Sequence, residues 1–280
     1  MRSMLLIAEL TLREAWRRKI AWIAVILGIA FVILYGIGFF FIFRDMGFTR
    51  GSALGSVALD SGVNMIAMSG LYAISFLGIM LTVLLSVGTL ANEIQTHTIQ
   101  SIATKAQGRA SIVLGKWLGL AAMLSLYIVL LAAGVALTTW LISGHLLPHL
   151  GEGLLLMVLE CLVMLSVCLA GGTLLATIPN GVVAFMMYGL AFVGGWIEQI
   201  GSAMHNETAV DIGILSSLIM PSEAVWKRAA YRMQPPALSS LNLSPFSMAS
   251  APSPMMLVYA ALYCAFFLWL AVRWFERSDL

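Results

Sequence analysis

The chain has 280 residues, of which 61% are hydrophobic and only 10% are charged, and its formal net charge is +2. A soluble domain carries about 25% charged residues, so this composition excludes an ordinary soluble globule. The small net charge gives no support to nucleic-acid binding. Several apolar blocks reach the roughly 20 residues that a helix needs to cross a bilayer. Because backbone groups in lipid must be satisfied within their own segment, we predict an all-α membrane protein.

The first 19 residues do not form a span, and we predict that residues 1–19 form an amphipathic helix in the membrane interface. At 100° per residue the predicted apolar stripe contains Met4, Leu5, Ala8, Leu12, Ala15 and Trp16. The charged residues off this stripe are Arg13, Glu14, Arg17 and Arg18. Leu6, Ile7 and Leu10 break the pattern. The apolar run that follows is too long for the core of a cleavable signal peptide.

Six apolar blocks within residues 20–280 are predicted to span the membrane, at about 20–43, 65–91, 112–142, 154–177, 181–201 and 255–273. Ten basic residues then fall on one side, namely Arg2, Arg13, Arg17, Arg18, Lys19, Lys105, Arg109, Lys116, Arg273 and Arg277. Five fall on the other, namely Arg44, Arg50, Lys227, Arg228 and Arg232. The positive-inside rule therefore places both termini in the cytoplasm.

The longest connection, residues 202–254, is predicted as an outer loop. Its apolar stretch Ile212 to Met220 is too short to cross, so it re-enters the membrane or lies on it. Ser222 is predicted to cap a short helix that runs to Tyr231, and the proline-rich remainder is predicted to be irregular. An alternative places this loop in the cytoplasm, with one span miscounted.

Few residues suggest chemistry. Glu160 lies inside the fourth predicted span, where a carboxyl group either faces the bundle interior or lies near the interface. We count it as the one deeply placed ionisable group, so no paired-carboxylate site is expected. His145 and His149 are four residues apart, but Pro148 lies between them and no third ligand is apparent, so no metal site is predicted. The three cysteines lie in apolar runs and are predicted to be free thiols: Cys161, Cys168 and Cys264.

Catalytic motifs are also missing from the sequence. The Gly115–Lys116 pair does not form a phosphate loop, because the spacing from Gly108 is wrong and Trp117 stands where a serine or threonine is needed. There is no His-Glu-x-x-His helix and no Gly-x-Ser-x-Gly elbow. We therefore predict no catalysis by this chain alone.

A polar segment at about 92–109 separates the second and third predicted spans. On a helix, Ile94, Thr98 and Ile102 form a narrow apolar face, while Glu93 and Lys105 point elsewhere. We predict that Asn92 caps this helix, that Gly108 ends it, and that Lys116 lies at the membrane interface beyond it. Such a helix is either a membrane-surface strut or a handle for a cytoplasmic partner.

This segment resembles a pattern in the permease subunits of type-2 ABC exporters, E-x-x-x-G-T-I-x-x-L-x-x-K-P-x-S-R-x-x-x-L-G-K. The matching residues are Glu93, Thr98, Ile99, Ile102, Lys105, Arg109, Leu114, Gly115 and Lys116. The departures are His97, Ala106 and Gly108, which replace the family's glycine, proline and serine. The N-terminal helix, the six spans and the long loop also resemble the family.

The resemblance implies that residues 92–109 form a coupling helix seated on a separate ATPase subunit, which would bind ATP and magnesium. It also implies a second permease copy or paralogue, the inner (plasma) membrane of a prokaryote, export, and no cofactor in this chain. The apolar, methionine- and phenylalanine-rich spans suit a hydrophobic or amphipathic substrate, and they suit plain packing equally well. Phe76, Phe185 and Tyr188, with Glu160, are then candidates for the translocation wall. The rival hypotheses are a membrane scaffold or sensor without an ATPase, and a secondary transporter, which is least favoured without an inverted repeat.

Overall fold

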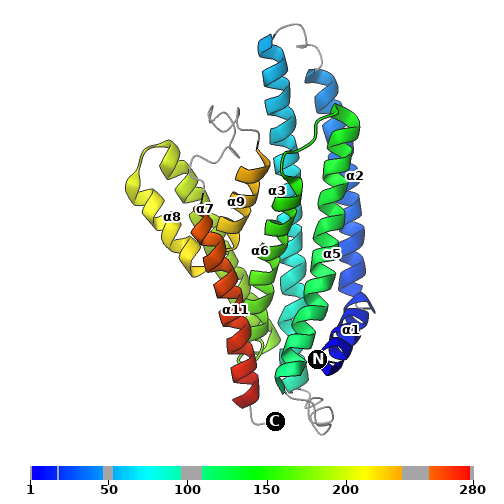
Figure 1. The fold of residues 1–280 in the computed structure, drawn as a ribbon, viewed down its shortest axis with the longest axis vertical. Coiled ribbons are helices and arrows are strands. Elements are labelled where there is room, and N and C mark those ends of the chain that lie inside the picture. The colour runs from blue at the N-terminus through cyan, green and yellow to red at the C-terminus, as the bar shows by residue number, and fades with distance from the viewer. Residues whose placement is uncertain (1, 18, 47–52, 96–108, 235–251, 278–280) are drawn as a thin grey trace.

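The computed structural model describes residues 2–17, 19–46, 53–95, 109–234 and 252–277, and these residues form helices without a strand. In chain order the helices are α1 (Arg2–Arg17), α2 (Lys19–Met46), α3 (Ala53–Gln95), α5 (Arg109–Ser143), α6 (Leu150–Gly171), α7 (Thr177–Ala203), α8 (Glu207–Ile219), α9 (Ser222–Met233) and α11 (Pro254–Arg277). Figure 1 shows the long helices running side by side.

Six of the described helices are long and apolar enough to cross a membrane, namely α2, α3, α5, α6, α7 and α11. They correspond to the six predicted spans, which confirms an all-α architecture with several helices capable of spanning a membrane. Helices α8 and α9 are long and apolar enough to cross a membrane only when they are taken together, and the chain bends by 110° between them.

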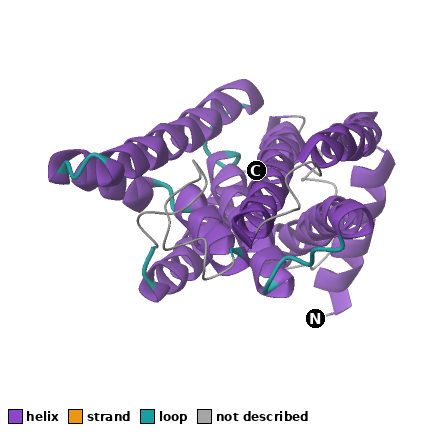
Figure 2. Cartoon of the chain, turned by 90° about the horizontal axis from the view of Figure 1, so that it is seen from above, coloured by secondary structure: helices purple, strands orange, loops and turns teal. Residues whose placement is uncertain are grey.

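The core lies where α3, α5 and α6 meet in the middle of the bundle (Figure 1). Leu71, Ile74 and Ile79 of α3 are fully buried there, as are Ile128 of α5 and Met164 of α6. Helix α2 instead lies at the edge and exposes many large apolar side chains. Seen along the helices in Figure 2, the N-terminus also lies at the edge of the bundle. An exposed apolar surface of this extent requires lipid or another protein to cover it.

The boundary between α6 and α7 differs from the prediction. The fourth span was expected to continue to residue 177, but α6 ends at Gly171 and α7 begins at Thr177. The side-chain amide of Asn180 donates to the Cys168 carbonyl at 2.9 Å and to the Val87 carbonyl of α3 at 3.3 Å. Asn180 lies so close to Gly171 that a Cβ there would collide with its side-chain oxygen. The side chain of Asn180 therefore caps the end of α6 at a point where hydropathy alone predicts that the span continues.

Helix α1 lies along the first turns of α5. Close approach is possible because α5 presents Gly115 and Gly119: a Cβ at Gly119 would lie 2.6 Å from the Ala8 carbonyl oxygen, and one at Gly115 2.7 Å from Cβ of Ile7. The face of α1 that packs on the bundle contains Ile7 and the buried Thr11. Two members of the predicted stripe, Ala8 and Ala15, also lie on this packed side.

The residues of the predicted stripe that turn away from the bundle are Leu5, Leu12 and Trp16, which are 61%, 36% and 45% exposed. Arg17 is exposed as well, and Arg18 lies outside the described residues. The edge of the Trp16 ring contacts Trp22 of α2, with ring centroids 5.6 Å apart. The helix predicted for residues 1–19 is thus present over Arg2–Arg17, and its position in the membrane interface stays a prediction.

The expected loop at 202–254 is helical over its first part. Small residues allow α8 to lie directly on α7, since a Cβ at Gly194 would collide with the side chain of Ser216 and one at Gly201 would lie 2.6 Å from the Ala209 Cβ. The chain then turns sharply into α9, which packs on α6. Ser222 does not cap α9 as predicted, because Pro221 occupies the N-cap position and Ser222 is the first helical residue.

Candidate functional site

The polar segment between the second and third spans lies largely outside the described residues. Thr98, Ile99, Ile102 and Lys105 belong to this undescribed part. Helix α3 continues through Asn92 and Glu93 to Gln95, so the prediction that Asn92 caps a new helix is wrong. No glycine or proline interrupts the chain between Leu90 and Gln95, and α3 continues for that reason.

The two helix ends that flank this segment are fixed to their neighbours. Lys116 of α5 is only 6% exposed, and its Nζ donates to the Thr89 carbonyl of α3 at 3.2 Å. Lys116 is therefore not the interfacial residue that was predicted, and it joins α5 to α3. Nη1 of Arg109, the first residue of α5, donates to the Glu276 carbonyl of α11 at 2.8 Å.

From Trp117, the residue after Lys116, a polar chain links α5, α6 and α11. The indole Nε1 of Trp117 donates to the Ser166 hydroxyl at 2.9 Å, and that hydroxyl lies 3.1 Å from Sγ of Cys264. Together with the Lys116 and Arg109 contacts, this chain connects four helices near the ends of α3 and α5. We call the set Thr89, Arg109, Lys116, Trp117, Ser166, Cys264 and Glu276 the basal clamp.

A second polar assembly lies inside the bundle, where α9 meets α3, α6 and α7. The Ser75 hydroxyl of α3 donates to Oε2 of Glu160, which is 1% exposed. Nζ of Lys227 in α9 lies 2.7 Å from Oε2 of Glu198 in α7, with side chains 3% and 7% exposed. The Tyr72 hydroxyl of α3 donates to Oε1 of Glu223 in α9 at 3.3 Å. We call Tyr72, Ser75, Glu160, Glu198, Glu223 and Lys227 the buried cluster.

The buried cluster corrects the expectation that Glu160 is the one deeply placed ionisable group. Glu198 is also buried and lies in α7, within the fifth predicted span. Glu223 and Lys227 are buried because the bend between α8 and α9 returns a charged helix to the bundle. Lys227 therefore does not count as a loop charge. Sequence reasoning treated Glu223 and Lys227 as outer-loop residues. The sequence does contain a signal for this burial. Glycines at 194, 195, 201 and 213 permit close helix packing, which brings α8 against α7.

Three carboxyl groups in the buried cluster face one ammonium group. Lys227 pairs with Glu198, and Tyr188 of α7 lies near Glu160 and Glu223. Helix α9 is not one of the six candidate spans. Burial raises the pKa of its Glu223 to about 7, although the Lys227 ammonium one turn away opposes that rise.

The predicted translocation-wall residues separate into two places. The rings of Phe76 and Tyr188 have centroids 6.2 Å apart, and Tyr188 borders the buried cluster beside Glu160. Phe185 instead lines an apolar groove between α3 and α7, together with Leu84 and Val182. The structure therefore brings Phe76, Tyr188 and Glu160 together and leaves Phe185 on the surface groove.

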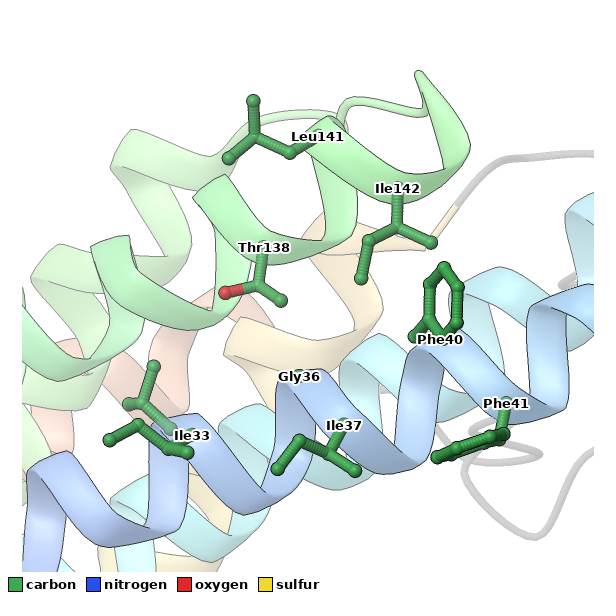
Figure 3. A pocket seen from close by; sticks show the side chains of 9 residues that line it. Ile33, Gly36, Ile37, Phe40, Phe41, Thr138, Leu141 and Ile142 are labelled. Atoms are coloured by element: carbon green, nitrogen blue, oxygen red, sulfur yellow. The ribbon is translucent and has the colours of Figure 1, made fainter.

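A further groove runs between α2 and α5, and Figure 3 shows the apolar side chains that line it. Its polar member is Thr138, whose hydroxyl already donates to the Gly134 carbonyl at 2.7 Å. Phe40, Phe41 and Ile142 supply hydrocarbon surface around it. This lining suits a lipid chain and offers no ligand for a polar substrate.

Among the described residues, no three histidine, cysteine or acidic side chains gather in a way that could hold a metal ion. Cys161, Cys168 and Cys264 are free thiols, as predicted. Nδ1 of His145 lies 3.9 Å from a carboxylate oxygen of Asp60. His149 precedes the first turn of α6.

Comparison of the sequence with known proteins does not extend these observations. No family model matches the chain, and no curated protein matches it.

Proposed function

We propose that this chain is the permease subunit of an ATP-driven exporter of hydrophobic or amphipathic molecules, of the type-2 ABC class. In this proposal residues 92–109 seat on a separate ATPase subunit, which binds ATP and magnesium. The observation that carries the proposal is the basal clamp, because a coupling segment transmits force only if both helices that hold it are fixed.

The contacts of the basal clamp support a stiff attachment. Lys116 joins α5 to α3, and Arg109 joins the first residue of α5 to α11. A displacement of the segment between Gln95 and Arg109 would therefore act on three candidate spans together. Helices α3 and α5 contain 43 and 35 residues, and at about 1.5 Å per residue both exceed the roughly 30 Å hydrocarbon core.

The surface of α1 supports an interfacial position. Its exposed Leu5, Leu12 and Trp16 turn away from the bundle, as lipid-facing side chains would. The positive-inside rule still favours cytoplasmic termini when the two buried lysines are left out of the count. Without Lys116 and Lys227 the basic side still carries an excess of arginine and lysine over the opposite side. The exposed apolar faces leave room for a second permease copy.

Purification of the tagged chain from its native membranes tests the proposal. An ATP-hydrolysing subunit should co-purify, and Ile99→Pro should reduce the recovered ATPase by about tenfold, equivalent to about 1.4 kcal/mol of binding. Lys105→Glu should also reduce the recovered ATPase. Arg44→Glu reverses an exposed charge in the last turn of α2, at the other end of the bundle from residues 92–109, and should leave the recovery unchanged.

A membrane scaffold or sensor is the rival function. It would yield a folded, purified chain without any nucleotide-binding subunit, and neither Ile99→Pro nor Lys105→Glu would alter its behaviour. Equal recovery of ATPase with Ile99→Pro and with the unaltered chain would refute the coupling role of residues 92–109.

A further inference from the structure

The buried cluster contains more acid than the protein neutralises there. Glu160, Glu198 and Glu223 are all buried, and the ammonium group of Lys227 lies 2.7 Å from Oε2 of Glu198. An ionised carboxylate buried without a partner costs several kcal/mol. Tyr72 and Ser75, three residues apart on one face of α3, donate to Glu223 and Glu160 and so hold the two carboxyl groups at the same helix face. Two neighbouring buried carboxyls cannot both ionise cheaply, so a proton is the simplest way to reduce the charge.

The surroundings of the Glu223 carboxyl group favour a bound proton. Its Oε1 accepts from Tyr72, but within the described part of the chain its Oε2 is buried without a hydrogen-bond partner. The side chain lies against Gly195 of α7, where a Cβ would come within 2.5 Å of Glu223 Cγ. The carboxyl is thus held at the junction of α3, α7 and α9, and a protonated oxygen there avoids burying a second uncompensated charge.

The cluster is assembled from separate parts of the fold. Helix α9 supplies Glu223 and Lys227, α3 supplies Tyr72 and Ser75, α6 supplies Glu160, and α7 supplies Glu198. At the far end of the α6–α9 contact, Arg232 and Glu152 form an exposed pair at 3.5 Å. A change of charge in the cluster therefore acts directly on how α9 is seated.

We propose that the buried cluster is a proton-binding site, in which a proton taken from water resides on the Glu223–Glu160 pair and holds α9 against α3, α6 and α7. Loss of that proton leaves two like charges at the junction and weakens the seating of α9. The site does not depend on an ATPase partner, so it stands or falls separately from the transport proposal.

Infrared difference spectroscopy of the full chain in lipid nanodiscs tests this site, because a protonated carboxyl has its own carbonyl stretch. Between about pH 5 and 7, well above the ordinary glutamate pKa of about 4.3, the unaltered chain should retain that band. Glu223→Gln should remove it. Asp211→Asn, an exposed carboxyl on the same hairpin, should leave it unchanged.

Two further variants keep the test decisive if Glu223→Gln does not fold. Glu160→Gln should abolish or shift the band, since it removes the neighbouring charge. Tyr72→Phe should move the titration to higher pH, because the hydroxyl stabilises the ionised Glu223. Absence of the band in the unaltered chain, or its persistence in both glutamine variants, would overturn the proposal. A midpoint that moves with sodium concentration at constant ionic strength would assign the site to a metal cation and overturn it equally.

Discussion

Replacing Lys227 with methionine removes the positive partner of Glu198 and leaves the shape of the side chain largely unchanged. Both side chains are less than one-tenth exposed, and their charged atoms are 2.7 Å apart. Removing one member of a buried ion pair costs about 3–5 kcal/mol, because the remaining charge stays buried. Lys227→Met should therefore lower the equilibrium constant for folding by a factor of roughly 10²–10⁴.

The three buried cysteines provide the assay. In mixed detergent micelles, a thiol-reactive dye should label Cys161, Cys168 and Cys264 only as the bundle opens, so the rate of labelling against denaturing detergent reports stability. The double variant Lys227→Met with Glu198→Gln should recover most of the loss, because no unpaired charge then remains.

The matched control lies on the same helix. Arg232 pairs with Glu152 at 3.5 Å, and these side chains are 47% and 52% exposed. Arg232→Met should cost no more than about 1 kcal/mol, since an exposed pair contributes little. If Lys227→Met and Arg232→Met have equal effects, or if the double variant is no more stable than Lys227→Met alone, the reasoning about the buried cluster is wrong.

Two further predictions concern how the helices are held. Gly119→Ala should loosen the docking of α1 by about 1–3 kcal/mol, because its Cβ would lie 2.6 Å from the Ala8 carbonyl oxygen, and limited proteolysis should then cut α1 faster. Gly38→Ala, with nothing within 4 Å, is its control and should be neutral. Asn180→Ala should cost about 1–3 kcal/mol in the thiol-labelling assay, since it leaves the Val87 and Cys168 carbonyls without their amide donor; unchanged labelling would contradict its role as a cap.

Hydropathy predicted the spans because each one buries or exposes a continuous apolar surface. It extended the fourth span past the end of α6, because Leu174, Leu175 and Ala176 resume the apolar run after Gly171 and Gly172. The decisive contact comes from Asn180, whose side chain reaches back to α6 and across to α3. Such a cap depends on tertiary structure, and no local pattern reports it.

The buried cluster was beyond sequence reasoning for a related reason. Helix α9 carries Glu223, Lys227, Arg228 and Arg232, a composition typical of an exposed loop helix. Its burial follows from the 110° bend after α8 and from the packing of α9 on α6, where Gly153 admits the side chain of Met233. Glu198 and Lys227 are 29 residues apart, and nothing in that separation predicts a 2.7 Å contact.

The contacts of the basal clamp were not predicted from the sequence. The family pattern assigned Arg109 and Lys116 to coupling with the ATPase subunit. Lys116 was also predicted to lie at the membrane interface, whereas the structure buries it between α5 and α3. A lysine can take either position, because its long stem allows the ammonium group to reach water or a carbonyl oxygen. The direction of the stem is set by the facing helix, which the sequence does not identify.

Site-specific photo-crosslinking in native membranes tests the central claim most directly. A photoreactive amino acid at Lys105 should capture an ATP-hydrolysing subunit, and the same group at Arg44 should capture none. Capture of that subunit from Arg44 but not from Lys105, or a chain with no ATPase crosslink at either position, would contradict the assignment of residues 92–109 as the coupling segment.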